Sequence, residues 1–296
     1  MEPCELCPRR CRVDRIGRRG FCGAGENLRV ALVSLHRWEE PCLVGENGAG
    51  TIFFTGCNLR CVYCQNFSIS QKNFGVDITV ERLAEIFIEQ QLRGAANIEL
   101  VTPTHFADKI CAAIDIAKGR GLKLPVVWNS NAYENISTLE MLRGRVDVFL
   151  PDVKYADDAV AEKFSAAPNY SAVAFAAVEK MFELVGAAQI DGGLMTRGVI
   201  VRHLVLPNFR RDAMKIVDRL HATFGDKIFL SLMNQYTPLH RAADFRQLRR
   251  TLTTFEYQSV VEHAIDIGVT NCFIQTGKTA DVAFVPSFNL AGVVKA

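Results

Sequence analysis

The chain has 296 residues, of which 49% are hydrophobic and 22% charged, as is typical of a globular protein with a large core. Its formal net charge of +2 is too small to indicate nucleic acid as the main partner. No apolar run approaches the roughly 18 residues of a membrane span, and the N-terminal stretch MEPCELCPRR lacks the apolar segment of a secretory signal. We therefore expect a cytoplasmic protein with no membrane partner, whose ten cysteines do not form structural disulfides.

The first part of the chain, residues 1–48, is rich in Cys, Arg and Gly and shows little apolar periodicity. Its cysteines follow the spacing C-x2-C-x3-C-x10-C and are Cys4, Cys7, Cys11 and Cys22. Four thiolates suit either a tetrahedral zinc site or an iron–sulfur cluster, and unligated redox-sensing thiols are a third alternative. Because so small a segment cannot be stabilised by apolar burial alone, we predict a metal-binding module here.

From residue 49 onward, short apolar segments alternate with amphipathic ones. The predicted strands span 51–56, 97–103, 124–130, 146–155, 198–207, 227–236 and 271–277. The predicted helices span 79–94, with Thr79 as N-cap, then 105–121, 136–144, 171–188, 211–225 and 257–268. Strands that are apolar throughout indicate a parallel sheet buried on both faces. We predict a complete or partial β/α barrel over residues 49–280, in preference to an open sheet, and a C-terminal tail over 281–296.

Three further cysteines directly follow the first predicted strand, in the stretch TGCNLRCVYCQN. Cys57, Cys61 and Cys64 have the spacing C-x3-C-x2-C, with no fourth cysteine nearby. The carboxyl ends of strands are where β/α barrels place their chemistry. A structural zinc site needs four ligands, and three cysteines would be an unusual set for catalytic zinc. A [4Fe–4S] cluster held by three cysteines instead leaves one iron free for a substrate or cofactor.

The segment CNLRCVYC resembles the signature of the radical S-adenosylmethionine (SAM) superfamily, with Tyr63 at its aromatic position. Over about residues 50–277 the chain is similar to pyruvate formate-lyase activating enzymes. With its N-terminal cysteines, it resembles an uncharacterised subgroup similar to those enzymes. The resemblance implies an α/β fold of the partial (β/α)6 TIM-like type. It also implies a [4Fe–4S] cluster on Cys57, Cys61 and Cys64, whose fourth iron binds SAM, and a 5′-deoxyadenosyl radical that abstracts hydrogen from a substrate.

Polar residues at the later strand ends are candidates for binding SAM. The resemblance assigns this role to Tyr63, to Thr102 and Thr104 flanking Pro103, and to Asn129, Ser130, Asn131, Asp152 and Lys154, and the strand positions of Arg202 and Gln235 make these two further candidates. Alternatives remain open from the residues themselves: 129–131 can form a turn and helix cap, and Asp152 with Lys154 a structural ion pair. Arg202, inside an apolar strand, needs an anionic partner such as the SAM carboxylate. The alternatives are a core residue for His203 and a solvated helix start for His105.

The resemblance implies a glycyl-radical activase, which abstracts hydrogen from a glycine loop presented by a partner enzyme. It also implies a low-potential electron donor of the flavodoxin or ferredoxin type. One alternative is a radical SAM enzyme that modifies a peptide or small molecule and carries an auxiliary metal site. The other is a non-catalytic iron–sulfur or zinc protein, which would not need Asp152, Lys154 and Arg202 at its strand ends.

Overall fold

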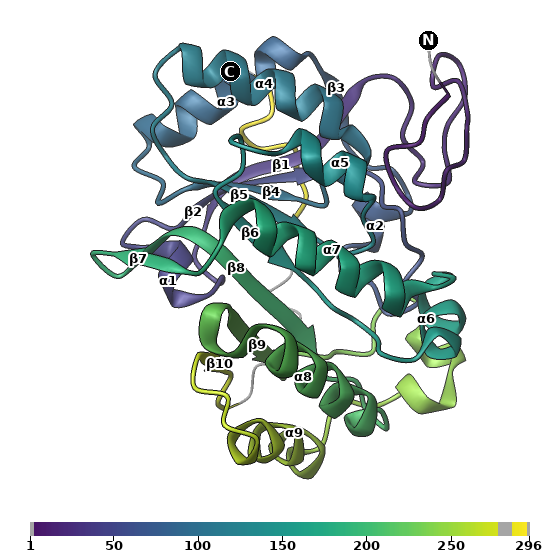
Figure 1. Ribbon diagram of the computed structural model, residues 1–296. Coiled ribbons are helices and arrows are strands. Elements are labelled where there is room, and N and C mark those ends of the chain that lie inside the picture. Colours follow the sequence, from purple (N-terminus) through teal and green to yellow (C-terminus); the bar gives the residue numbers. More distant parts are fainter. Residues whose placement is uncertain (1–2, 278–285, 295–296) are drawn as a thin grey trace.

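The computed structural model describes residues 3–277 and 286–294, which form one large sheet with helices packed around it (Figure 1). The strands are β1 (Leu28–His36), β2 (Ala49–Phe54), β3 (Val76–Ile78), β4 (Ile98–Val101), β5 (Val126–Ser130), β6 (Val148–Pro151), β7 (Gln189–Asp191), β8 (Leu194–Leu204), β9 (Phe229–Met233) and β10 (Cys272–Ile274). The α-helices are α1 (Pro41–Val44), α2 (Phe67–Ser70), α3 (Val80–Leu92), α4 (Ala107–Gly119), α5 (Ile136–Met141), α6 (Asp158–Ser165), α7 (Tyr170–Val185), α8 (Arg210–Phe224) and α9 (Thr254–Asp266).

The parallel part of the sheet runs in chain order through β2, β4, β5, β6, β8, β9 and β10. In the described residues β10 ends one side of the sheet and β3 the other, so the strands form a partial barrel that does not close. Each parallel crossover contains a helix of the predicted series, and α3 begins as predicted after Thr79, whose side chain accepts a hydrogen bond from the Arg82 backbone. The predicted partial β/α barrel is confirmed.

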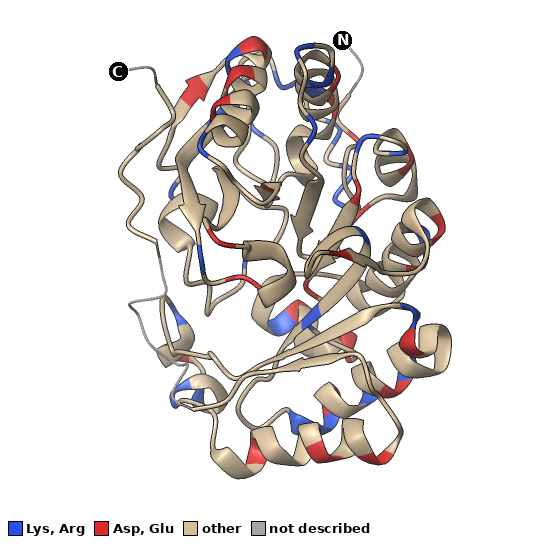
Figure 2. Ribbon diagram, turned by 90° about the vertical axis from the view of Figure 1, so that its left-hand side faces the viewer, with Lys and Arg blue, Asp and Glu red and all other residues tan. Residues whose placement is uncertain are grey.

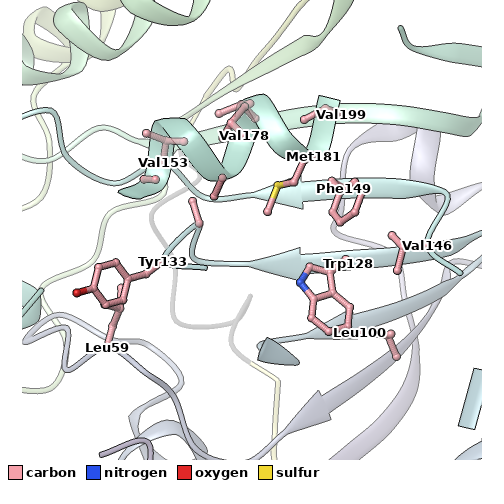
Figure 3. Close-up of a cluster of buried hydrophobic side chains, with 14 of the residues drawn as sticks. Leu59, Leu100, Trp128, Tyr133, Val146, Phe149, Val153, Val178, Met181 and Val199 are labelled. Carbon is pink, nitrogen blue, oxygen red and sulfur yellow. The ribbon is translucent and has the colours of Figure 1, made fainter. Parts of the chain in front are cut away.

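The core lies between the sheet and its helices. Trp128 of β5 pairs in register with Leu100 of β4 and Phe149 of β6, and all three are fully buried. Figure 3 shows these side chains together, with Val178 and Met181 of α7 on the neighbouring helix. Charged residues lie mostly on the helices and loops, whereas the strands are largely free of them (Figure 2). Strands buried on both faces explain the continuous apolar segments in the sequence.

The sequence analysis missed β1, which lies within the stretch assigned to the cysteine-rich module. β1 pairs antiparallel with β2, from His36 opposite Ala49 to Val30 opposite Phe54, and so extends the sheet beyond its parallel part. The described part of the predicted tail, residues 286–294, runs beside β1: the Val33 amide donates to the Ala291 carbonyl at 2.9 Å. Residues 281–285 and 295–296 of that tail lie outside the described residues. The domain boundaries therefore stay a prediction.

Smaller elements were also missed, among them α6 and the β7–β8 hairpin. α6 follows β6 directly and is capped by Asp157, whose carboxylate accepts from the amides of Ala159 and Val160. The turn of the hairpin uses Gly192 and Gly193, both with positive φ. Among the described helices, none combines the length and the apolar composition that crossing a bilayer requires.

Candidate active site

A cavity of about 560 Å³ lies at the carboxyl ends of the parallel strands. The end of every parallel strand from β2 to β10 contributes to its lining, for example through Val101 of β4, Ser130 of β5 and Met233 of β9. Its volume is within the range of small-molecule and cofactor sites. The cavity therefore occupies the position at which β/α barrels place their chemistry.

The three cysteines after β2 line this cavity, and each sulfur has a hydrogen-bond partner. Asn131 Nδ2 donates to Cys57 Sγ at 3.4 Å, and Ser165 Oγ donates to Cys61 Sγ at 3.0 Å. Ser70 Oγ lies 3.2 Å from Cys64 Sγ. Hydrogen bonds of this kind stabilise thiolates and tune the reduction potential of iron–sulfur clusters.

The electrostatics of these thiols favours metal ligation. Burial, and next the neighbouring Cys61, raise the pKa of Cys57 to about 12 and that of Cys64 to about 11. Burial also raises the pKa of Cys61. At neutral pH such thiols stay protonated unless a cation compensates the thiolate charge, which is what cluster iron does.

The spacing of the donors is informative too. Among residues 3–277 and 286–294, no three Cys, His, Asp or Glu side chains are close enough together to hold a single metal ion. In a cubane cluster the three thiolates of such a loop each bind a different iron, which leaves the fourth iron open.

A chain of buried hydroxyl groups extends from Cys61 to Tyr63, the aromatic residue of the signature. Ser165 Oγ lies 2.7 Å from the Tyr155 hydroxyl, which lies 2.6 Å from the Tyr63 hydroxyl. Burial raises the pKa of both tyrosines well above the usual value, so both remain neutral. The chain fixes the Tyr63 ring against the cavity, whose lining includes Tyr63.

Arg202, Asp152 and Lys154 form one buried charged group, as their strand positions suggested. Arg202 Nε donates to Asp152 Oδ1 at 2.8 Å, and Lys154 Nζ donates to Asp152 Oδ2 at 3.0 Å. Burial alone would raise the pKa of Asp152, but Arg202 and Lys154 outweigh it and hold the pKa below its usual value. The remaining nitrogens of Arg202 donate to Glu39 at 2.9 Å and to Asn129 at 2.7 Å. The anionic partners that Arg202 needs are thus present within the chain.

The other predicted SAM residues divide into two groups. Thr102, Asn129, Ser130, Asn131 and Gln235 line the cavity with the charged group and the cysteines. Thr104 does not line it, because its hydroxyl group is buried and donates to Glu134 at 3.0 Å. The two histidines lie in the core: His203 Nδ1 is 2.8 Å from the Val153 carbonyl, and His105 Nε2 is 2.8 Å from that of Thr55. A solvated ring for His105 was therefore the wrong alternative.

Sequence reasoning missed three carboxylates at or near the cavity, Glu39, Glu40 and Glu99. Glu39 and Glu40 lie in the turn between β1 and α1 and line the cavity. Glu99 of β4 accepts from Asn129 Nδ2 at 2.6 Å, and burial raises its pKa well above the usual value. A signal was present in the segment WEEP, two adjacent acids directly after an apolar run, but that run was not assigned as a strand.

The N-terminal cysteines lie against the loop that carries Cys57. A Cβ atom at Gly20 would stand 3.2 Å from Cys11 Sγ and 3.4 Å from Cys22 Sγ. Burial raises the pKa of Cys7 to about 12, and the other three cysteines raise it further. The Cys57 amide donates to the Cys22 carbonyl at 3.1 Å. The four sulfurs are thus gathered in one segment that is hydrogen-bonded directly to the cysteine loop.

Comparison with known proteins decides the family. Residues 51–232 match the radical SAM superfamily. The chain belongs to this superfamily. It is 32% identical over 271 residues to the uncharacterized protein MJ0674 of Methanocaldococcus jannaschii, a match that covers 88% of this chain and 74% of that protein.

Two solved structures share the fold. SuiB of Streptococcus suis, bound to S-adenosylmethionine, has a TM-score of 0.51 and 11% identity over 75% of this chain and 48% of SuiB. Methylornithine synthase (PylB) has a TM-score of 0.51 and 14% identity over 71% of this chain and 59% of that enzyme. The chain thus spans about half the length of these structures. As a radical SAM enzyme, it uses a [4Fe–4S] cluster and SAM and needs a reductant.

Proposed function

We propose that Cys57, Cys61 and Cys64 hold the [4Fe–4S] cluster and that SAM binds in the adjoining cavity, where a substrate loses a hydrogen atom. The observation that carries this is the convergence of three cysteine sulfurs, each with a hydrogen-bond partner, on one cavity at the strand ends. When bound, the cluster and SAM supply one electron and the sulfur–carbon bond that yields the 5′-deoxyadenosyl radical. The chain's own residues bind, orient and shield these groups.

The charged group provides the polar contacts for the methionine part of SAM. The Lys154 ammonium has three hydrogens and donates one to Asp152, which leaves hydrogens to donate to the SAM carboxylate. Asn129 and Arg202 support this site from behind, because each makes hydrogen bonds to other residues of the floor. Ser130 and Asn131 present short polar groups toward the ribose.

For the substrate, the hypothesis that follows from the sequence is a glycine loop of a partner enzyme, with an electron donor of the flavodoxin or ferredoxin type. Its test is the EPR spectrum of a glycyl-radical enzyme incubated anaerobically with this protein, SAM and reduced flavodoxin. A glycyl-radical doublet that depends on Cys61 supports an activase. If 5′-deoxyadenosine forms and no doublet appears, the activase hypothesis fails for that partner.

A second candidate is the modification of a small molecule or a peptide side chain. It is favoured by Glu40, because this carboxylate lines the cavity and has one oxygen without a hydrogen-bond partner among the described residues. Transfer of deuterium between labelled substrate and 5′-deoxyadenosine would identify the hydrogen that is abstracted.

We also propose that Cys4, Cys7, Cys11 and Cys22 hold a second metal centre. Support comes from the four gathered sulfurs and from their hydrogen-bonded connection to the Cys57 loop. Four thiolates suit either an iron–sulfur cluster or a tetrahedral zinc ion. Metal and sulfide analysis of the Cys11→Ser/Cys22→Ser variant distinguishes the two: loss of iron and sulfide indicates a cluster, and loss of zinc indicates a zinc site.

A further inference from the structure

We infer that the cavity recognises its substrate through a cationic nitrogen group, an ammonium or guanidinium, that pairs with the Glu40 carboxylate. The inference rests on the proposed function, since it concerns the substrate of the same cavity, and it deepens that function by naming a chemical class. Glu40 is assigned no role in binding the cluster or SAM. Its carboxylate is a feature of the cavity that the proposed function does not use.

The position of Glu40 shows that its side chain is not needed for local structure. Glu40 stands at the N-cap of α1, yet its side chain makes no capping hydrogen bond. Its backbone carbonyl accepts from the Leu43 amide at 2.7 Å, so the turn is closed by the main chain alone. The side chain instead lines the cavity and is 7% exposed.

One oxygen of this carboxylate has no partner. Glu40 Oε2 is buried and makes no hydrogen bond to any described residue. Burial raises the pKa of Glu40, against the lowering effects of Arg202 and of a hydrogen bond with Ser231. A buried, unsatisfied carboxylate costs free energy, and a ligand that donates to it recovers that cost.

Two cations at the strand ends, Arg202 and Lys154, donate hydrogen bonds to groups other than Glu40. Arg202 donates through its three nitrogens to Asp152, Glu39 and Asn129. Lys154 donates to Asp152. Arg202 and Lys154 are therefore engaged by Asp152 or Glu39, which leaves the Glu40 oxygen for a cation supplied by the ligand.

The rest of the lining suits a group with an apolar stem and a charged end. Met233, Phe273 and Trp38 line the same cavity and offer apolar contacts. A methylene chain can pack on such residues while its terminal nitrogen reaches a carboxylate. The same chemistry is found in a free diamine or agmatine and in a lysine or arginine side chain of a peptide.

The test is calorimetric titration of the reconstituted protein with its cluster and SAM bound. The cationic probes are putrescine, agmatine and the end-capped tripeptides Gly-Lys-Gly and Gly-Arg-Gly. The neutral counterparts are 1,4-butanediol and the tripeptides with norleucine or citrulline in the central position. The free amines and the tripeptides distinguish a small-molecule substrate from a peptide.

We expect at least one cationic probe to bind with a Kd below about 1 mM, and its neutral counterpart to bind about tenfold or more weakly. Glu40→Gln should weaken binding of the cationic probe by about tenfold or more, and Glu40→Asp should weaken it by less. The matched control is Glu46→Gln, since Glu46 is an exposed carboxylate outside the cavity. The affinity of this control variant for the cationic probe should equal that of the wild type.

Three results would overturn the inference: no saturable binding of any cationic probe up to about 10 mM, equal affinity for cationic and neutral probes, or equal affinity in wild type and Glu40→Gln. Loss of SAM affinity without loss of probe affinity in Glu40→Gln would assign Glu40 to SAM and equally refute it. If Glu40→Gln does not fold, the inference is still tested by the wild type, which should bind the arginine tripeptide more tightly than the citrulline tripeptide. Because the readout is binding, failure of SAM cleavage would count against the proposed function alone.

Discussion

Replacement of Ser165 by alanine should lower the reduction potential of the cluster. Ser165 is fully buried at the end of α6 and its hydroxyl group donates to Cys61 Sγ at 3.0 Å. Alanine removes that donor and adds no volume, and no water can take its place without opening the core. The hydrogen bond already lowers the pKa of Cys61 against the effect of burial, so it stabilises negative charge on the sulfur.

The magnitude follows from the change in charge on reduction. The reduced cluster carries one more electron, so it gains more from the donor than the oxidised cluster does. A difference of about 1 kcal/mol for one buried hydrogen bond corresponds to about 40 mV for a one-electron couple. The potential of Ser165→Ala should therefore lie about 40 mV below that of the wild type.

The assay is an anaerobic redox titration in which the EPR signal of the reduced cluster is followed. Ser171→Ala is the control, because Ser171 lies on α7 and does not line the cavity. Its potential should equal that of the wild type. A potential for Ser165→Ala that is unchanged within about 10 mV, or that rises, would refute the claim that Cys61 is a cluster ligand and accepts a hydrogen bond from Ser165.

Three further predictions concern the surroundings of the site. Gly56→Ala should lower the iron content after reconstitution and destabilise the fold by about 2 kcal/mol. The reason is that the φ of Gly56 is +92° and a Cβ atom there would lie 2.6 Å from the Cys22 carbonyl oxygen. Normal iron content in this variant would contradict the prediction. Asp152→Asn should lower the free energy of unfolding, measured with urea, by about 3 kcal/mol, since Arg202 and Lys154 lose their shared carboxylate. A decrease under about 1 kcal/mol would show that these ion pairs are dispensable for stability. Glu256, whose pKa is lowered to about 2 mainly by Arg250, stabilises the cap of α9. Glu256→Gln should therefore cost about 1–2 kcal/mol at pH 7. That difference should shrink as the pH falls from 4.5 toward about 2, and one that persists at low pH would oppose this account.

The alternation of strands and helices was predictable because each parallel strand is buried on both faces. The segment around Trp128, for example, is apolar up to the strand end, where Asn129 and Ser130 introduce the polar groups of the site. The same logic placed Asp152, Lys154 and Arg202 at one cavity. Polar residues at the end of an apolar strand must meet other polar groups, and neighbouring strand ends supply them.

The features of the fold and the site that could not be predicted depend on contacts between segments that are distant in sequence. β1 was missed because it pairs antiparallel with β2 and has no crossover helix, so the repeating pattern does not include it. Its absence from the prediction hid Glu39, which neutralises Arg202 across 163 positions of the chain. Thr104 could not be separated from Thr102 by sequence, since the single turn at 104–106 directs its hydroxyl group to Glu134 and away from the cavity.

The central claim is tested most directly by measuring 5′-deoxyadenosine formed from SAM by the anaerobically reconstituted protein with a low-potential reductant. The comparison is between wild type, the Cys57→Ala/Cys61→Ala/Cys64→Ala variant and a Cys111→Ala control, whose cysteine lies on α4 outside the cavity. Product from the wild type and the control, and none from the triple variant, is the predicted result. Equal product from the triple variant, or none from a wild type with full iron and sulfide content, would contradict the assignment of these three cysteines to a radical SAM cluster.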